Sequence, residues 1–553
     1  MRQCREEYAR WCKSVTDTDI LRALSEIADS DSAIADAFSR ELTFGTGGLR
    51  GVLGVGTARM NIYTVSRATS GVAKYARMIS DTPSAAIGYD TRHQSCELAH
   101  AAAEIFSRMG VSVHVFSEPL PTPMLSYAVR TLGTTVGVMI TASHNPREYN
   151  GYKVYGADGC QITDGVAGEI LGYIRSSDYF GVEGDAHAPV KNIPDTLFDE
   201  YIARISKCSV LYGDVARKDI KIVYTALSGT GYKPIMRVLG ANGYTHIHPV
   251  TEQCTPDPDF TTCPRPNPEL DEALMLAAAL AERVSADVVL ATDPDSDRVG
   301  VMIPRDGGYA RISGNEVGAL LLDYVASQRS YHGTMPKEPV VIKSVVTAPI
   351  IERIAASYGA MTHNVLTGFK YIGEMIGRLE EEGRAEDLLI GVEESCGYLT
   401  APYVRDKDGV AASLLIAEMT ALYRARGITL SERLDELYSR HGYEVNLLVT
   451  EILEGDIGST RIREFMRIAR TTRGKVILGV TAEGITDYLG GIYGLPPTDS
   501  VTFTTDGLTV TVRPSGTEPK IKLYITATSC DRERADITAR ETVSRIRAFI
   551  NNS

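Results

Sequence analysis

The chain has 553 residues, 44% of them hydrophobic and 23% charged, which is typical of a globular protein and excludes disordered and fibrous classes. At about 150 residues per domain, this length predicts three or four domains. The formal net charge of -13 gives no general attraction for nucleic acid or an anionic membrane, so an anionic ligand needs local Arg and Lys clusters.

Signals for membrane insertion, secretion and disulfides are weak. No stretch approaches the roughly 18 apolar residues of a membrane helix, and the charged start MRQCREEYARW lacks the apolar core of a signal peptide. Nine scattered cysteines fit reduced thiols better than a disulfide framework. His246, His248, Cys254 and Cys263 lie near one another in sequence, but their spacing matches no common zinc pattern. We therefore expect a cytoplasmic protein.

The first forty residues suggest amphipathic helices at 19–27 and 32–42. The stretch FGTGGLRG at 44–51 follows, where four glycines let the backbone approach a ligand and Arg50 offers a guanidinium to an oxyanion. It is not a P-loop, because no GK[ST] follows. A purely structural glycine turn is an equal alternative.

Helices and strands then alternate, which predicts a mainly parallel sheet with helices on both faces. The predicted helices are 66–79, 96–109 and 123–131, and the predicted strands are 85–89, 111–116 and 134–140. The last strand enters TASHNP at 141–146, ahead of a turn-rich tract at 147–151. Ligands of such sheets bind beyond the carboxyl ends of the strands, so Ser143 places a hydroxyl at that edge. The alternative is a Ser/Asn/Pro turn without chemistry.

A second α/β unit ends in a cluster of acidic residues. Its predicted strands are 220–224, 245–250 and 286–291, with a helix at 269–283. The last strand leads into DPDSDR, which sets Asp293, Asp295 and Asp297 at alternating positions. Three anions in one place need a cation, and oxygen ligands select Mg²⁺ or Ca²⁺. An EF-hand is excluded because Arg298 and Pro304 stand at its sixth and twelfth positions. A hairpin tip is the alternative, although Arg298 beside the cluster suggests an anionic partner.

A third unit presents a polar loop. Its predicted helices are 315–327, 349–358 and 371–379, and its predicted strands are 339–344 and 387–392. The second strand ends in EESCGY at 393–398, where Glu393 and Ser395 offer acceptors and a donor to sugar hydroxyls. Acidic residues at the start of a helix or turn would look the same. Lys343, Lys370, Arg405 and Lys407 add positive charge nearby in sequence.

The last hundred residues change character. Predicted helices at 430–440, 459–471 and 532–550 interleave with antiparallel-type strands at 443–450, 501–504, 508–512 and 521–527. RPSGTEPK lies between the last two strands. Its guanidinium, hydroxyls and backbone amide are suited to a phosphate cradle made by Arg513, Ser515, Gly516 and Thr517.

Together the motifs offer a hydroxyl nucleophile, carboxylates for a cation, a loop suited to sugar hydroxyls and a phosphate cradle. This combination indicates phosphoryl transfer on a small phosphorylated polyol. A hydrolase with a GxSxG elbow is disfavoured, because Thr141 and Asn145 stand where the glycines are required.

The five motifs, in this order and at these separations, resemble the longer branch of the α-D-phosphohexomutase superfamily over roughly residues 40–525. The resemblance implies three similar mixed α/β domains and a C-terminal α+β domain of TATA-binding-protein-like fold around a central cleft. The boundaries expected from it are 1–205 (N-terminal helices and phosphoserine domain), 206–310 (metal-binding), 311–428 (sugar-binding) and 429–553 (phosphate-binding).

The resemblance also implies roles for the motif residues. Ser143 matches the phosphoserine, and Mg²⁺ is expected between Asp293, Asp295, Asp297 and a phosphate oxygen on Ser143. Lys153 matches the general acid/base, aided by Arg50, and His144 supports the serine loop. Adjacent residues of an extended segment point apart, so we favour Lys153 over His144 for proton transfer. The substrate-binding matches are Arg298, Glu393, Ser395, Lys370, Arg513, Ser515, Gly516 and Thr517.

The implied activity interconverts glucose 1-phosphate and glucose 6-phosphate, with glucose 1,6-bisphosphate as intermediate and activator. TGFK at 367–370 resembles the glucose-type branch, whereas Leu227-Ser228 departs from the histidine that related chains tend to have in that turn. Mutases for mannose, pentose or glucosamine phosphates, a hexose-bisphosphate synthase, and an inactive sugar-phosphate sensor stay as alternatives. The expected partners are small-molecule sugar phosphates, without nucleic acid or membrane, bound by a monomer or homodimer.

Overall fold

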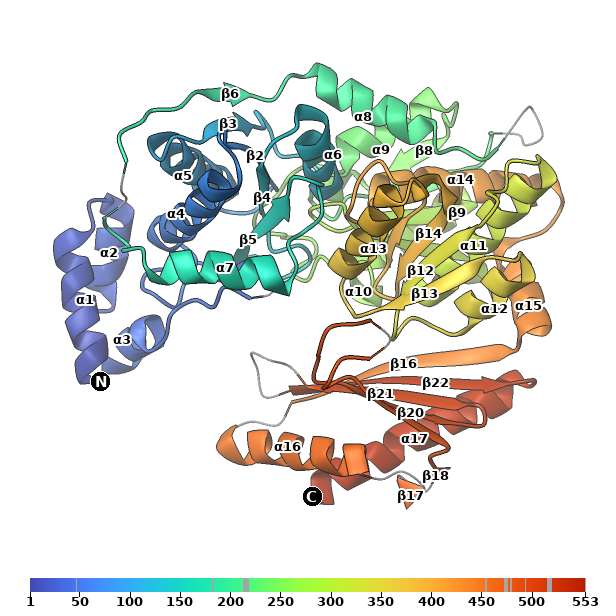
Figure 1. Cartoon of the computed structure of the whole chain (residues 1–553). Coiled ribbons are helices and arrows are strands. Elements are labelled where there is room, and N and C mark those ends of the chain that lie inside the picture. The colour runs from blue at the N-terminus through green and yellow to red at the C-terminus, as the bar shows by residue number, and fades with distance from the viewer. Residues whose placement is uncertain are drawn as a thin grey trace.

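The structure, a computed structural model, describes residues 1–45, 47–181, 184–211, 218–452, 455–471, 476–477, 480–492, 494–514 and 520–552. Four main sheets follow one another along the chain. In Figure 1 the first three lie in the upper body and the fourth lies apart, below them. The predicted class of three mixed α/β domains followed by a C-terminal α+β domain is confirmed.

Three helices precede the first sheet: α1 (Arg2–Ser14), α2 (Thr18–Glu26) and α3 (Asp31–Phe38). The sequence predicted the second and third but not α1. Asp17 and Ser30 cap α2 and α3 by accepting hydrogen bonds from N–H groups of the first turn. Trp11 of α1 is fully buried and packs edge-on against Phe38 and Tyr63, so aromatic packing fixes α1 to the body.

The first sheet has the strand order β1-β5-β4-β2-β3-β6. Its strands are β1 (Gly48–Val52), β2 (Ser84–Tyr89), β3 (Ser112–Val115), β4 (Val136–Ile140), β5 (Tyr149–Gly156) and β6 (Val190–Asn192). Its helices are α4 (Ile62–Ile79), α5 (Ser95–Arg108), α6 (Thr122–Leu132), α7 (Asp164–Arg175) and α8 (Thr196–Ser206). α4 begins at Ile62 rather than at residue 66, because Asn61 caps it by accepting from the N–H groups of Tyr63 and Thr64.

The turn-rich tract expected at 147–151 is partly wrong. β5 already starts at Tyr149 and lies between β1 and β4, antiparallel to both. Pairing on both edges satisfies its backbone groups, which overrides the local turn preference of Asn150 and Gly151. The sheet is therefore parallel from β4 to the β6 edge and antiparallel from β4 to the β1 edge.

The second and third sheets repeat this plan. The second has the order β11-β10-β9-β7-β8 and the third β13-β12-β14-β15. Their strands are β7 (Ile222–Thr225), β8 (Ile247–Pro249), β9 (Val288–Thr292), β10 (Val299–Arg305), β11 (Gly308–Ile312), β12 (Val340–Ser344), β13 (Met361–Val365), β14 (Leu388–Glu393) and β15 (Gly397–Leu399). The helices between Tyr232 and His441 are α9 (Tyr232–Ala241), η1 (Thr251–Gln253), α10 (Asp271–Val284), α11 (Gly314–Tyr331), α12 (Ile350–Ser357), α13 (Phe369–Glu381), η2 (Ala385–Asp387), α14 (Gly409–Ala425) and α15 (Leu430–His441).

One motif occupies the same turn in each of these sheets. TASHNP joins β4 to its antiparallel neighbour β5, DPDSDR joins β9 to β10, and EESCGY joins β14 to β15. In every case a strand that is parallel to one neighbour meets an antiparallel return. The three domains thus present their chemistry at equivalent positions.

The fourth sheet is wholly antiparallel, in the order β16-β22-β21-β20-β19, with α16 and α17 against one face (Figure 1). Its elements are β16 (Tyr443–Ile452), α16 (Gly455–Thr471), β19 (Gly484–Asp487), β20 (Val501–Thr505), β21 (Leu508–Pro514), β22 (Lys520–Ser529) and α17 (Arg532–Asn552). A separate pair is formed by β17 (Val476–Ile477) and β18 (Val480–Thr481).

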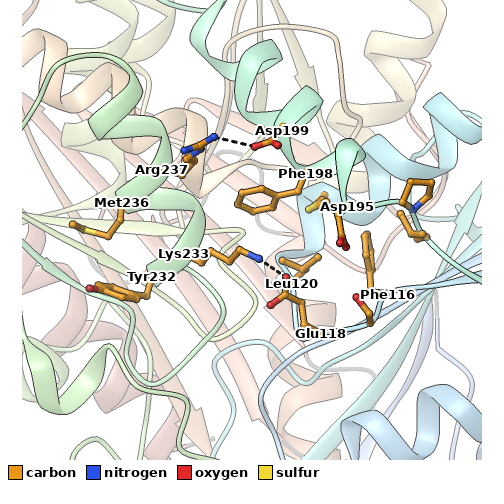
Figure 2. A pocket seen from close by; sticks show the side chains of 14 residues that line it. Phe116, Glu118, Leu120, Asp195, Phe198, Asp199, Tyr232, Lys233, Met236 and Arg237 are labelled. Atoms are coloured by element: carbon orange, nitrogen blue, oxygen red, sulfur yellow. Dashed lines mark hydrogen bonds and ion pairs between the residues drawn. The ribbon is translucent and has the colours of Figure 1, made fainter.

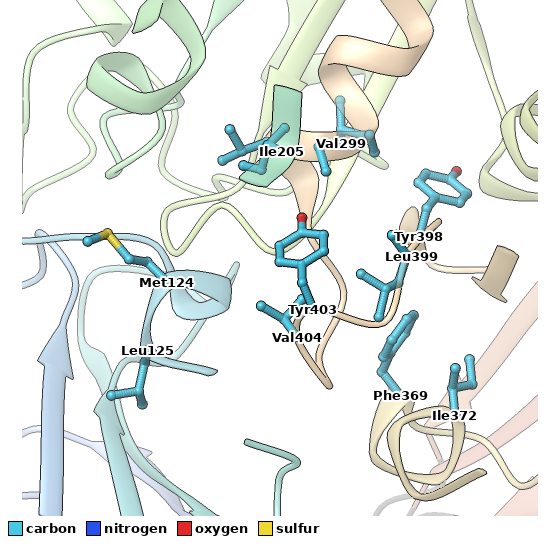
Figure 3. Close-up of a cluster of buried hydrophobic side chains, with 14 of the residues drawn as sticks. Met124, Leu125, Ile205, Val299, Phe369, Ile372, Tyr398, Leu399, Tyr403 and Val404 are labelled. Atoms are coloured by element: carbon cyan, nitrogen blue, oxygen red, sulfur yellow. The ribbon is translucent and has the colours of Figure 1, made fainter. Parts of the chain in front are cut away.

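The two largest clusters of buried apolar side chains lie in different parts of the molecule. One cluster runs without a break through the first three domains; Figure 3 shows Met124 of the first, Val299 of the second and Tyr398 of the third within it. The fourth domain has its own cluster, centred on β20–β22. No helix in the described part of the chain combines the length and apolar character needed to cross a bilayer.

Candidate active site

The serine loop leaves the sheet at the end of β4 in a strained conformation. Ser143 is buried and has φ 53°, in the left-handed region that non-glycine residues rarely adopt. Its N–H donates to Thr141 Oγ1 at 2.8 Å, and Thr141 Oγ1 donates to Asp90 Oδ2 at 2.6 Å. The expectation that Ser143 and His144 point apart is wrong: the segment is not extended, and Ser143 Oγ lies 3.1 Å from His144 Nδ1.

The hydroxyl of the first domain meets the acidic loop of the second. Ser143 Oγ donates to Asp293 Oδ2 at 2.7 Å. Asp293, Asp295 and Asp297 are buried, and one oxygen from each lies within 4.8 Å of the others. Burial and the charges of Asp295 and Asp297 raise the pKa of Asp293. A cation at this point would remove that repulsion.

Two oxygens of the acidic loop test whether a cation fits. Asp295 Oδ1 and Asp297 Oδ1 are buried and have no hydrogen-bond partner among the described residues. Unpaired buried carboxylate oxygens are costly, and hard cations such as Mg²⁺ take such ligands. The donor set therefore fits a divalent cation. Among the described residues this is the one group of three ligating side chains that lie close enough together to hold an ion, and it does not include His246, His248, Cys254 or Cys263.

Two lysines from other domains hold the opposite oxygens of the triad. Lys153 on β5 contacts Asp295 Oδ2 at 2.9 Å and Asp297 Oδ2 at 3.4 Å. Lys407, ahead of α14, contacts Asp297 Oδ2 at 2.8 Å. Burial opposes the charge of Lys153, but Asp295 and Asp297 outweigh it and raise its pKa. Burial likewise opposes ionisation of Asp295, yet the Lys153 ammonium brings its pKa well below the usual range.

The sequence missed two members of this group. In the sequence Lys407 is one of four cations near the third-domain motif, and Thr122 belongs to no motif. The Thr122 N–H donates to Asp295 O at 2.9 Å and its hydroxyl to Asp295 Oδ2 at 2.7 Å. The cluster RDKD at 405–408 was the available signal for Lys407. No sequence signal distinguishes Thr122 from other helix-starting threonines.

The remaining arginines and His144 surround the serine. Arg50 on β1 donates to Asn145 Oδ1 at 3.3 Å. The Arg298 N–H donates to Asp293 Oδ1 at 3.1 Å, while its guanidinium pairs with Glu269 at 3.2 Å. Burial and the charges of Arg298 and Arg50 keep the pKa of His144 well below its ordinary value. The imidazole beside Ser143 is therefore neutral.

The predicted sugar loop lies close to this site. Glu393 is buried at the end of β14, and a Cβ built on Gly397 would lie 3.3 Å from Glu393 Oε2 and 2.6 Å from Lys407 Cδ. Because Lys407 pairs with Asp297, the third-domain loop lies beside the acidic loop. Ser395 is half-buried in the turn that follows. Lys370 is held elsewhere: it starts α13 and donates to Asp164 of the first domain at 2.8 Å.

Only the first residue of the predicted phosphate cradle can be placed. Arg513 lies on β21, paired with Lys522 of β22. The fourth sheet faces the third domain, because Thr511 of β21 and Tyr524 of β22 line one pocket together with Lys343. Ser515, Gly516 and Thr517 lie outside the described residues.

A pocket of about 680 Å³ lies between the first and second domains. Figure 2 shows its apolar floor, including Leu120 and Phe198, and two ion pairs across it, Lys233 with Glu118 and Arg237 with Asp199. No residue of the predicted site lines it. The convergence of the motifs, and not this pocket, defines the candidate site.

Comparisons with known proteins agree with this geometry. Family models for phosphoglucomutase/phosphomannomutase match in chain order: alpha/beta/alpha domain I at residues 41–179, domain II at 199–307, domain III at 313–441 and the C-terminal domain at 489–542. A phosphoglucomutase of Staphylococcus haemolyticus (strain JCSC1435) is 36% identical over 88% of this chain and 90% of its own.

Two further relatives extend the comparison. A phosphoglucomutase of Staphylococcus aureus (strain USA300) is 33% identical over 93% of this chain and 94% of its own. A crystal structure of a phosphoglucomutase/phosphomannomutase family protein from Burkholderia thailandensis shares the fold, with a TM-score of 0.68 at 19% identity over 91% of this chain and 96% of its own.

Proposed function

The chain belongs to the phosphoglucomutase/phosphomannomutase family of the α-D-phosphohexomutase superfamily, and on this premise we propose that it interconverts glucose 1-phosphate and glucose 6-phosphate. It is a phosphosugar mutase. The choice of glucose is supported by the phosphoglucomutase relatives and by the TGFK sequence at 367–370. The observation that carries the proposal is the 2.7 Å contact of Ser143 Oγ with Asp293, beside two buried carboxylate oxygens that accept no hydrogen bond from the described residues.

In this proposal Ser143 carries the phosphoryl group and exchanges it with the sugar. A serine hydroxyl is a weak nucleophile at its free pKa, so neighbouring groups must take and return its proton. Lys153, with Arg50, supplies that function, and neutral His144 holds the hydroxyl at 3.1 Å. Asp293, Asp295 and Asp297 would hold Mg²⁺ together with a phosphate oxygen on Ser143; the ion supplies neutralisation of phosphoryl charge.

The other motif residues would bind the substrate. Glu393 and Ser395 accept and donate hydrogen bonds to sugar hydroxyls, while Arg298 and Lys370 attract phosphate. Arg513, with Ser515, Gly516 and Thr517, cradles the phosphate that is not being transferred. Glucose 1,6-bisphosphate forms when Ser143 gives up its phosphoryl group, and it must reorient before returning the other one. The same bisphosphate added to the dephosphorylated enzyme would reload Ser143.

A substrate panel tests the choice of sugar. We expect kcat/KM for glucose 1-phosphate to exceed that for mannose 1-phosphate, ribose 1-phosphate and glucosamine 1-phosphate. A higher value for one of these sugars would mean that the protein is the mutase for that sugar. Bisphosphate as the main product would mean that it is a bisphosphate synthase.

Ser143→Ala tests the chemistry itself. We expect loss of turnover, and no mass gain of one phosphate after incubation with glucose 1,6-bisphosphate. Ser395→Ala is the matched control, because it should still gain the phosphate and mainly raise KM. Full turnover by Ser143→Ala would reject the mechanism. If the wild-type protein binds sugar phosphates but does not turn them over, it is a sugar-phosphate sensor instead of a mutase.

We also propose the domain boundaries 1–205, 206–310, 311–428 and 429–553, a monomeric or homodimeric state, and a cytoplasmic location.

A further inference from the structure

Arg92 lies beneath the serine loop and is fully buried, although no motif of the proposed function includes it. Its side chain is 0% exposed, as is that of Asp90, with which it forms an ion pair at 3.1 Å. A buried guanidinium is retained only where its donors are well used. The contacts of Arg92 therefore indicate what this pair does.

Those contacts are with the backbone of the serine loop and of Tyr149, the first residue of β5. Arg92 Nη2 donates to the carbonyl oxygens of Ser143 and Asn145, the latter at 2.6 Å. Arg92 Nη1 donates to Pro146 O at 2.9 Å and Tyr149 O at 3.2 Å. A loop that leaves the sheet ladder needs outside donors for its carbonyls, and one guanidinium supplies four of them.

Asp90 fixes the same loop from its other end. Its carboxylate accepts from Arg92 Nε and from the hydroxyls of Thr141 and Ser95, at 2.6 and 2.7 Å respectively. Thr141 Oγ1 in turn accepts the Ser143 N–H at 2.8 Å. The pair thus holds both sides of Ser143, whose left-handed φ of 53° is unfavourable without such support.

The segment also contacts the second domain. The Arg92 guanidinium lies 4.9 Å from the ring centre of Phe260, and Thr91 Oγ1 donates to Ser228 O at 3.0 Å. Ser228 belongs to the Leu227-Ser228 turn, and Thr230 just beyond it donates to Pro294 O in the acidic loop. The frame that orients Ser143 is therefore joined to the element that positions Asp293.

We propose that Asp90 and Arg92 are positioning residues that hold the Ser143 hydroxyl in line with the acidic loop. They do not contact the sugar, because both are buried beneath the loop. The inference rests on the proposed role of Ser143. Lysine offers one point charge in place of the fork of donors, so Arg92→Lys cannot serve all four carbonyls.

The test compares phosphoryl transfer in Arg92→Lys and wild type. Each protein is loaded with radiolabelled glucose 1,6-bisphosphate, separated from free ligand and mixed with unlabelled glucose 6-phosphate, and transfer of the label from Ser143 to the sugar is followed in rapidly quenched samples. We expect kcat and the transfer rate to fall roughly 10²-fold, as for a nucleophile displaced by about 1 Å. KM should stay within about twofold, because substrate contacts are unchanged. A transfer rate equal to that of wild type would overturn the proposal.

Arg67→Lys is the matched control. Arg67 is a buried arginine of the same domain that donates to the carbonyls of Ile174 and Ser177 and pairs with Glu41, but it does not touch the serine loop. It should lower the Tm and leave the transfer rate unchanged. An equal loss of transfer in Arg67→Lys would mean that general destabilisation, not positioning, is responsible.

Two variants keep the outcomes distinct. If Arg92→Lys does not fold, Asp90→Asn retains the guanidinium and weakens the frame, and it must slow transfer with KM unchanged for the proposal to stand. Ser143→Ala separates the two proposals. If Ser143→Ala is inactive while Arg92→Lys and Asp90→Asn transfer normally, only the positioning inference fails; if Ser143→Ala is active, the proposed function fails.

Discussion

At the scale of single residues, the negative charge of the acidic loop is partly neutralised by ammonium groups from the first and third domains. Asp297 Oδ2 contacts Lys407 at 2.8 Å and Lys153 at 3.4 Å, and both lysines are largely buried. Removing one partner of a buried ion pair leaves an uncompensated charge. The two lysines therefore stabilise the folded protein by neutralising the carboxylates, and a bound cation could do part of this in their place.

Lys407→Met tests this balance. We expect the EDTA-treated variant to lose on the order of 3 kcal/mol of stability, because Lys153 and the more distant Arg298 Nε, 3.9 Å from Asp297 Oδ1, are then the remaining cationic partners of the three carboxylates. Mg²⁺ should then raise the Tm of the variant more than that of wild type. Lys233→Met is the control: its surface pair with Glu118 is worth less than about 1 kcal/mol and does not touch the triad. An equal Mg²⁺ response in wild type and Lys407→Met would contradict the prediction.

Glu394, beside the proposed sugar contact Glu393, gives a pH dependence. Burial and the charge of Glu393 raise the pKa of Glu394 from 4.5 to about 7, although Ser344 donates to it at 2.8 Å. The folded state thus holds a proton that the unfolded state releases. This contribution to stability is fully present below pH 4.5 and is lost as the pH rises to about 7, at up to about 1.4 kcal/mol per pH unit.

Glu394→Gln should remove this dependence, because the amide does not titrate. Between pH 5 and 8 the Tm of the variant should rise relative to wild type, as measured by scanning calorimetry. Glu464→Gln serves as control: the hydrogen bond from Arg467 lowers the pKa of Glu464, so that exposed carboxylate is already ionised over this range. A constant Tm difference between Glu394→Gln and wild type would rule out the shift.

At the scale of elements, the acidic loop is shaped by the turn after β7. A Cβ at Gly229 would lie 2.3 Å from Pro294 Cα, so only glycine lets the turn approach the β9–β10 connection. Gly240 lies in the following helix α9, and a Cβ built on it would have no atom from elsewhere in the protein within 4 Å. The two glycines should respond to alanine in opposite directions.

Gly229→Ala should cost about 1–3 kcal/mol by overpacking and weaken Mg²⁺ binding in calorimetric titration, since it displaces the acidic loop. Gly240→Ala should stabilise by about 0.5–1 kcal/mol through its helix preference, with Mg²⁺ affinity unchanged. Unaltered Mg²⁺ affinity in Gly229→Ala would mean that the turn after β7 does not determine the conformation of the acidic loop.

At the scale of the whole molecule, the two main cores predict that the fourth domain can open by itself. Leu523 of β22 is fully buried in the cluster of the fourth domain. Leu290 of β9 is fully buried in the cluster that the first three domains share. Either Leu→Ala change should cost about 2–5 kcal/mol of local stability. The effect should stay within the core that is altered.

Hydrogen exchange checks this expectation. Leu523→Ala should lower protection in β16 and β20–β22 and leave β2, β9 and β14 unaffected. Leu290→Ala should lower protection across the first three domains together. Uniform loss of protection in both variants would show one cooperative unit.

The sequence by itself determined the alternation of helices and strands, the place of TASHNP, DPDSDR and EESCGY after buried strands, and the choice of Ser143 and the three aspartates as candidates. These features depend on local patterns: apolar runs, turn residues and dense charge within a few positions. Local pattern failed at β5, where pairing on both edges overrides turn residues, and at Ser143, where a positive φ turns the hydroxyl towards His144.

Only the tertiary structure decided which groups meet. Thr122 and Lys407 reach the acidic loop from more than a hundred residues away in sequence, and Lys370 is held by Asp164 rather than joining the triad. Arg92 looks like an ordinary cation in the sequence, yet it donates to three carbonyls of the serine loop and to one at the start of β5. Contacts of this kind follow from the packing of whole domains, because the energy of a buried charge depends on the partners that the fold brings to it.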